Sequence, residues 1–128
     1  MGQQQLLLIV LGVIIVGIAV VVGINLFSAN AVTANRDAVV ADLTNLAAMA
    51  QQFYRKPVAL AGGGNTFTGW TIPTQLATTV NGTYTVTVAA QAVTLVGVGR
   101  ELGNDGTSGV KATMVVGPRA ITSTTINN

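Results

Sequence analysis

Length, composition and charge already restrict what this chain can do. It has 128 residues, of which half are hydrophobic and only ten are charged, with a net charge of +2. Cysteine and histidine are both absent, which excludes disulfides, thiolate or imidazole metal sites, and Cys–His or Ser–His–Asp catalysis. The six basic residues are scattered, so no basic patch indicates nucleic-acid binding. We therefore expect no catalytic residue, cofactor, metal or enzymatic activity.

The first predicted element is an apolar helix over residues 6–27. This block holds 17 Leu, Ile, Val or Phe among its 22 residues, Asn25 is its one polar side chain, and Arg36 is the first charged residue. An α-helix needs about 20 apolar residues to cross the hydrocarbon core of a bilayer. We assign residues 1–28 to this N-terminal segment, which is predicted to lie in lipid or against other apolar helices, and residues 29–128 to a globular head.

The helical pattern continues past the apolar block. Apolar residues recur at steps of four and three, which places them on one face of a helix. They are Val39, Leu43, Leu46, Ala50 and Phe53. Asp37 and Asp42 lie mostly off that face, and Pro57 ends the helix because the residue before a proline avoids the α region. The sequence therefore predicts one helix from about Gly2 to Arg55, apolar in its first half and amphipathic in its second.

Glycine- and threonine-rich segments follow the helix. Residues 62–65 predict a flexible loop, and residues 66–73 predict a short extended piece or a covering loop. The glycines at 62–64, 97 and 99 lack the Lys-Ser/Thr or the full glycine fingerprint that opens a helix in phosphate-binding loops. We assign these glycines to turns, bulges or close packing.

Three segments predict β-strands, because apolar and polar residues alternate there or form short apolar runs. They are residues 83–88, 93–98 and 110–116. Asn81-Gly82 is a turn signal before the first strand, and residues 100–109 are predicted as a polar loop. The apolar strand faces need a partner layer, which the amphipathic half of the helix supplies. We therefore expect an α+β fold, with a long N-terminal helix packed on a small antiparallel sheet of three to four strands.

The predicted core of the head combines one helix face with inward-facing strand residues. It comprises Val39, Leu43, Leu46, Phe53, Tyr84, Val86, Leu95 and Met114.

This architecture resembles the type IV pilin superfamily, whose members form pili and secretion pseudopili. In that family a long N-terminal helix, apolar in its first half, carries a β-sheet packed on its second half. In sequence the resemblance is specific at residues 3–12, Gln-Gln-Gln-Leu-Leu-Leu-Ile-Val-Leu-Gly. Two positions depart from the family pattern. The usual glutamate is replaced by Gln5 if Met1 is the mature start, or by Leu7 if cleavage follows Gly2, and Val22 stands where many pilins have proline.

The resemblance implies a structural subunit of an extracellular surface filament that is inserted in the membrane before assembly. The implied partners are copies of itself in a helical homopolymer, a prepilin peptidase and the pilus assembly machinery. The implied filament core comprises Leu6, Leu7, Leu8, Ile9, Leu11, Ile14, Ile15, Ile18, Val22 and Phe27. The N-terminal polar tip comprises Gln3, Gln4 and Gln5, and a glutamine there can accept a hydrogen bond from a neighbour's amine.

Several alternatives stay open at the level of sequence. The chain is also compatible with a pseudopilin of a secretion or DNA-uptake piston, and with a monomeric membrane-anchored binding module. Glu101, Asn104 and Asp105 either offer oxygen ligands to Ca²⁺ or form a solvated turn. The triplet Asn81-Gly82-Thr83 matches the N-glycosylation sequon, which also arises by chance in a Thr-rich chain.

Overall fold

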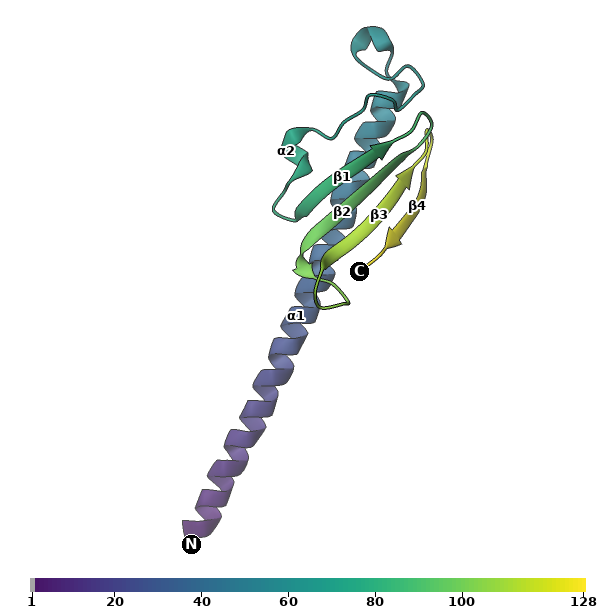
Figure 1. The fold of residues 1–128 in the computed structure, drawn as a ribbon. Coiled ribbons are helices and arrows are strands. Elements are labelled where there is room, and N and C mark those ends of the chain that lie inside the picture. Colours follow the sequence, from purple (N-terminus) through teal and green to yellow (C-terminus); the bar gives the residue numbers. More distant parts are fainter. Residues whose placement is uncertain (1) are drawn as a thin grey trace. The chain divides into compact units, whose positions relative to one another are not determined.

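The computed structural model describes residues 2–128, so Met1, the first residue of the predicted segment 1–28, lies outside the described residues. The elements are shown in Figure 1: α1 (Gly2–Arg55), η1 (Val58–Leu60), α2 (Thr74–Ala77), β1 (Gly82–Val88), β2 (Val93–Leu102), β3 (Gly109–Val116) and β4 (Ile121–Ile126). The chain divides into two compact units after Ala31, three residues beyond the predicted boundary. We call residues 2–31 the helical unit and Val32–Asn128 the head.

The helical unit is apolar on every side. No proline precedes Pro57, and no acidic residue occurs in the first turn of α1. Gly12, Gly17 and Gly23 lie within the helix without interrupting it, although a helical glycine costs about 1 kcal/mol relative to alanine. By length and composition this helix is able to cross a membrane.

The loop after η1 closes the C-terminal end of α1. The Gly63 N–H donates a hydrogen bond of 2.7 Å to the carbonyl oxygen of Phe53, which supplies one of the donors that the last helical turn lacks. A Cβ on Gly62 would lie only 2.2 Å from the carbonyl oxygen of Lys56, so this approach requires glycine. Residues 62–65, predicted as a flexible loop, are therefore fixed by backbone hydrogen bonds to the helix end.

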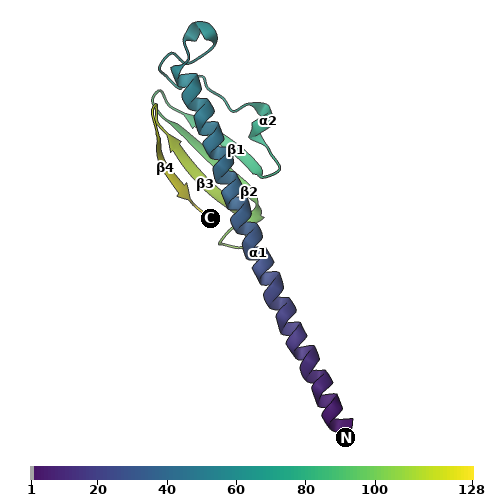
Figure 2. The same ribbon diagram turned by 180° about the vertical axis from the view of Figure 1, so that it is seen from behind.

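The strands form one antiparallel sheet in the order β1-β2-β3-β4 (Figures 1 and 2). Tyr84 of β1 pairs with Gly97 of β2, and Leu95 of β2 pairs with Met114 of β3. β2 continues to Leu102 after a register shift, so the predicted loop over residues 100–109 is wrong at its start and Gly109 already belongs to β3. β4, for which the sequence predicts no range, is exposed along its whole length and lacks the alternation of a half-buried strand.

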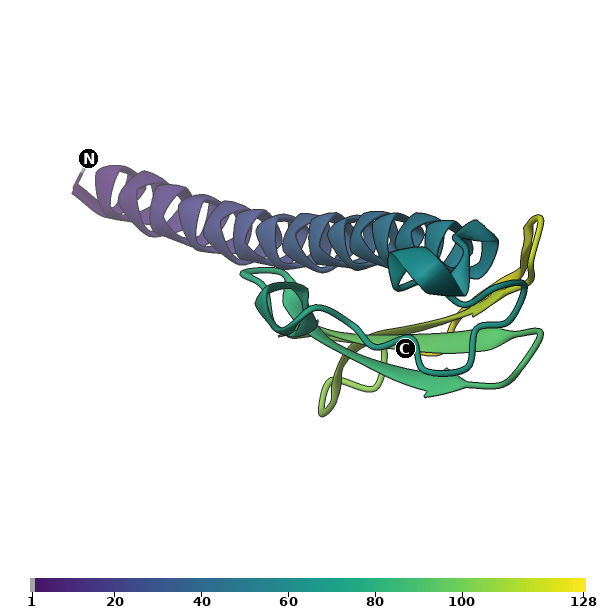
Figure 3. The same ribbon diagram turned by 90° about the horizontal axis from the view of Figure 1, so that it is seen from above.

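The core of the head lies between α1 and one face of the sheet, and Figure 3 shows these two layers from above. The buried members of the predicted core are Val39, Leu43, Leu46, Tyr84, Leu95 and Met114. Phe53 and Val86 are partly buried and pack against them, while Phe67 and Trp70 enter the core from the connection before β1. A Cβ on Gly97 would lie 2.7 Å from Val39 Cγ1, so glycine permits the close contact of helix and sheet. The predicted α+β fold is confirmed.

Candidate functional site

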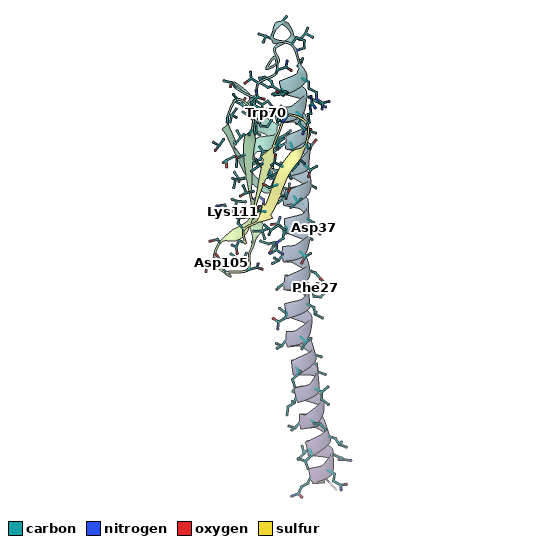
Figure 4. The ribbon with its side chains drawn as sticks, turned by 90° about the vertical axis from the view of Figure 1, so that its right-hand side faces the viewer. Phe27, Asp37, Trp70, Asp105 and Lys111 are labelled. Atoms are coloured by element: carbon teal, nitrogen blue, oxygen red, sulfur yellow. The ribbon has the colours of Figure 1, made fainter. Side chains whose placement is uncertain are left out.

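The candidate functional site is the side-chain surface of the helical unit. The ten residues assigned to a filament core are all between 51% and 79% exposed, and Phe27, labelled in Figure 4, is the most exposed of them. Water around so large an apolar surface is unfavourable, at roughly 25 cal/mol for each Å² that is not buried. Exposed apolar patches of this extent mark contacts with lipid or with other proteins.

The start of this helix is polar but carries no charged side chain. Gln3, Gln4 and Gln5 are exposed in the first turns of α1, and no carboxylate precedes Asp37 in the sequence. The glutamine amides supply hydrogen-bond donors and acceptors without a full charge. The described part of this helix therefore offers apolar side chains along its length and uncharged polar groups in its first turns.

In the head, a carboxylate on α1 collects donors from the segment around the start of β1. Asp42 Oδ2 accepts hydrogen bonds from Thr79 Oγ1 (3.2 Å), Asn81 Nδ2 (3.1 Å) and the Tyr84 hydroxyl. Burial, together with the hydrogen bond to Asp42, raises the pKa of Tyr84 above its usual value, so the hydroxyl stays protonated and donates. This arrangement joins helix to sheet within the head.

The glycosylation triplet is part of the same arrangement. The Asn81 side chain donates to Asp42, and its backbone makes two further hydrogen bonds. The Asn81 carbonyl oxygen accepts a bond of 2.9 Å from Asn35 Nδ2, and the Asn81 N–H donates to Thr79 Oγ1 at 3.1 Å. Asn81 therefore joins the segment before β1 to α1 within the head.

The loop that contains Asp105 is held by its own hydrogen bonds. Asp105 Oδ1 accepts from the N–H groups of Thr107 and Ser108, both at 2.9 Å, and from Asn128 Nδ2 at 3.1 Å. These bonds, with that from Thr107 first, lower the pKa of Asp105 to about 2. Within residues 2–128 no group of three or more His, Cys, Asp or Glu side chains is placed to hold a metal ion. The Asp105 side chain thus holds the turn through Thr107 and Ser108.

Neither a protein-family model, nor a curated protein, nor a solved structure matches this chain. The class of protein is defined by the fold and by the site, namely a small α+β head together with an apolar helix that is able to cross a membrane.

Proposed function

We propose that this chain is the structural subunit of an extracellular type IV pilus-like filament, and that the same helix holds it in the membrane before assembly. The observation that carries this proposal is the exposure of apolar residues on every side of the helical unit, in a chain whose head has its own core. Such a helix is stable in lipid or in a bundle of like helices. A repeated contact between copies that does not close generates an open helical polymer.

Two features favour a polymer over a permanent membrane anchor. No charged side chain occurs in residues 2–35, so this stretch lacks the Lys or Arg residues that commonly fix a span at the membrane surface. The helix also continues into the head without a break, because α1 spans Gly2–Arg55. Both features suit a helix that leaves lipid for a bundle. No charged side chain in residues 2–35 has to be withdrawn from the membrane surface, and no flexible linker interrupts α1.

The resemblance supplies the proposed partners, which are further copies of the chain, a prepilin peptidase and the pilus assembly machinery. In the filament, the helices form the core and the heads form the outer shell. The role is structural, and the exposed apolar residues act through burial alone.

The test compares the full chain with a chain that begins at Ala29. After detergent removal, the full chain is expected to form filaments in negative-stain micrographs, because residues 6–27 have to be covered again. The shortened chain should remain monomeric by light scattering, since its core lies in the head. Filaments from the shortened chain would contradict the role of the helix. Full-length protein that stays bound to vesicles as a monomer would support the anchored module, and short polymers alone would support the pseudopilin.

A further inference from the structure

Two arginines of the head share one hollow. Arg55 lies in the last turn of α1, and Arg119 lies in the turn between β3 and β4. Together with Tyr54, Asn65 and Pro118 they line a hollow of about 530 Å³. Ligand pockets commonly measure about 300–1,000 Å³, so the hollow has the size to take a small molecule.

These two arginines differ from the other two in the chain. The guanidinium groups of Arg36 and Arg100 donate hydrogen bonds of 3.3 Å and 2.8 Å to other residues of the head. Arg55 and Arg119 are exposed. Within residues 2–128, the two arginine side chains that make no hydrogen bond are therefore the two that meet at this hollow.

Among the described residues, no carboxylate lines the hollow beside these cations. All four acidic residues of the chain fall within residues 37–42 and 101–105. The lining comes from residues 54–65 and 118–119, which contain no acidic side chain. The walls therefore carry two positive charges, and an anion that enters the hollow meets attraction from both.

One wall of the hollow is fixed by hydrogen bonds. The Asn65 N–H donates to the carbonyl oxygen of Tyr54 at 2.8 Å, and Gln91 Nε2 donates to the carbonyl oxygen of Asn65 at 3.2 Å. The Tyr54 hydroxyl donates to Gln91 Oε1 at 2.9 Å. Both backbone groups of Asn65 are thus engaged, whereas its side-chain amide has no partner within the described residues and stays available to a ligand.

The turn that carries Arg119 is tied to the helix. The Gly117 N–H donates to the Ala120 carbonyl oxygen at 2.8 Å, and Gln51 Nε2 on α1 donates to the Gly117 carbonyl oxygen at 3.3 Å. Figures 1 and 2 both show this turn near the C-terminal end of α1. A site whose backbone is set before binding loses less conformational entropy when its ligand arrives.

We propose that this hollow binds a phosphate monoester through Arg55, Arg119 and the side-chain amide of Asn65. Guanidinium groups offer paired N–H donors whose geometry matches phosphate oxygens. Together the two arginines carry two positive charges, which a phosphate dianion balances and a single carboxylate does not. The phosphate belongs either to a soluble molecule or to a lipid headgroup, since both present the same terminal oxygens. The inference goes beyond the proposed function and does not depend on filament assembly, because every residue of the hollow lies in the head.

The experiment is a heteronuclear NMR titration of the full chain in uncharged detergent micelles, with inorganic phosphate, glycerol phosphate or acetate as the probe. The measured signals are the side-chain N–H groups of Arg55, Arg119 and Asn65. Arg55→Gln and Arg119→Gln each remove one charge, whereas Arg119→Lys keeps the charge and loses the paired donors. Lys56→Gln is the matched control, because Lys56 is an exposed cation next to Arg55 in the sequence but lines a different hollow.

Both phosphates should shift the three side-chain signals, and acetate should bind at least about fivefold more weakly, because it balances only one of the two charges. Each Arg→Gln change should weaken phosphate binding at least about tenfold, Arg119→Lys about threefold, and the control by less than about twofold. Unshifted side-chain signals, or equal affinity for acetate and phosphate, would overturn the proposal. So would an equal loss in Lys56→Gln and the Arg→Gln variants, which would show a diffuse attraction of anions.

Micelles that contain phosphatidic acid separate the two sources of phosphate. If this lipid competes with glycerol phosphate for the same three signals, the site takes a lipid headgroup. If glycerol phosphate binds and the lipid does not compete, the site takes a soluble phosphate. Either result supports the phosphate site and assigns its source.

Discussion

The Asp42 carboxylate shows how a single side chain fixes helix and sheet relative to each other within the head. One of its oxygens accepts three hydrogen bonds, and the donors lie 37, 39 and 42 residues later in the chain. Hydrogen bonds to a charged group typically contribute about 1.5–3 kcal/mol each. The network therefore adds directional contacts to a core that is otherwise held by non-directional apolar packing.

Asp105 gives a prediction about pH. Its pKa is lowered from 3.8 to about 2 in the folded protein, so the unfolded state binds the proton more readily. The stabilisation of the loop is then complete above the ordinary carboxyl pKa and is lost as the pH falls through about 2. In an NMR titration of the chain beginning at Ala29, the Thr107 and Ser108 amide shifts should change with a midpoint near 2. Asp105→Asn should abolish this step, whereas a midpoint near 3.8 would show that the carboxylate lacks these bonds.

At the scale of elements, α1 and three of the strands could be predicted because periodicity marks them. The amphipathic face of α1 repeats every three to four residues, and the Thr and Val residues of β1 alternate. β4 could not be placed in this way, since its six residues are all exposed. The extension of β2 to Leu102 was also hidden, because a register shift lies between Val98 and Leu102. Irregular pairing of this kind depends on the partner strand rather than on local sequence.

The candidate site, like the fold, could be predicted from the sequence only in part. The apolar helix is predictable because composition alone decides it, with 17 large apolar residues in a block of 22. The partners of Asp42 and the hollow that Arg55 and Arg119 share are not predictable, because each combines residues from separate parts of the chain. Arg119 joins Arg55 at one hollow only after the sheet has folded back on the helix.

The helix face of the head gives a prediction about stability. Leu43 is fully buried in the core, so Leu43→Asp places a charge among apolar side chains. An uncompensated buried charge destabilises by several kcal/mol, comparable with the whole stability of a small domain. We expect the chain beginning at Ala29 to lose its cooperative thermal transition when it carries this change.

The matched control for that change is Ala48→Asp, on an exposed position of the same helix. The control should destabilise by no more than about 0.7 kcal/mol, the difference in helix propensity. If Leu43→Asp melts like the control, Leu43 does not belong to the core.

At the scale of the whole molecule, assembly is expected to depend on apolar contacts more than on charge. No carboxylate precedes Asp37, so an ion pair at the start of the helix cannot hold the filament core. Apolar burial is nearly independent of ionic strength, whereas exposed charges are screened over about 8–10 Å at physiological salt. Filaments should persist at high salt and should dissociate in detergent, which competes for residues 6–27. Micrographs and sedimentation across salt and detergent series measure this.

Two substitutions sharpen the same prediction. Gln5→Ala should be tolerated, because the glutamine contributes only dipolar contacts, whereas Ile15→Asp should abolish assembly or membrane insertion. A charge in the middle of an apolar span costs about 2.5–3.5 kcal/mol even on the mildest scale, and the sequence offers no countercharge within residues 2–35. Disassembly by salt alone, or normal filaments from Ile15→Asp, would refute this account of the core.

The continuity of α1 from Gly2 to Arg55 has a consequence for folding. The first turn of an isolated helix is difficult to form, with a nucleation constant of about 10⁻³, while each added residue is close to neutral or favourable. Packing of Val39, Leu43 and Leu46 on the sheet already fixes several turns of α1. The apolar half can therefore grow from a preformed nucleus, and we expect it to remain helical during the proposed transfer from lipid to a bundle of helices. A head that fails to fold would withdraw that nucleus, so a defect far from the apolar residues would also impair their helicity.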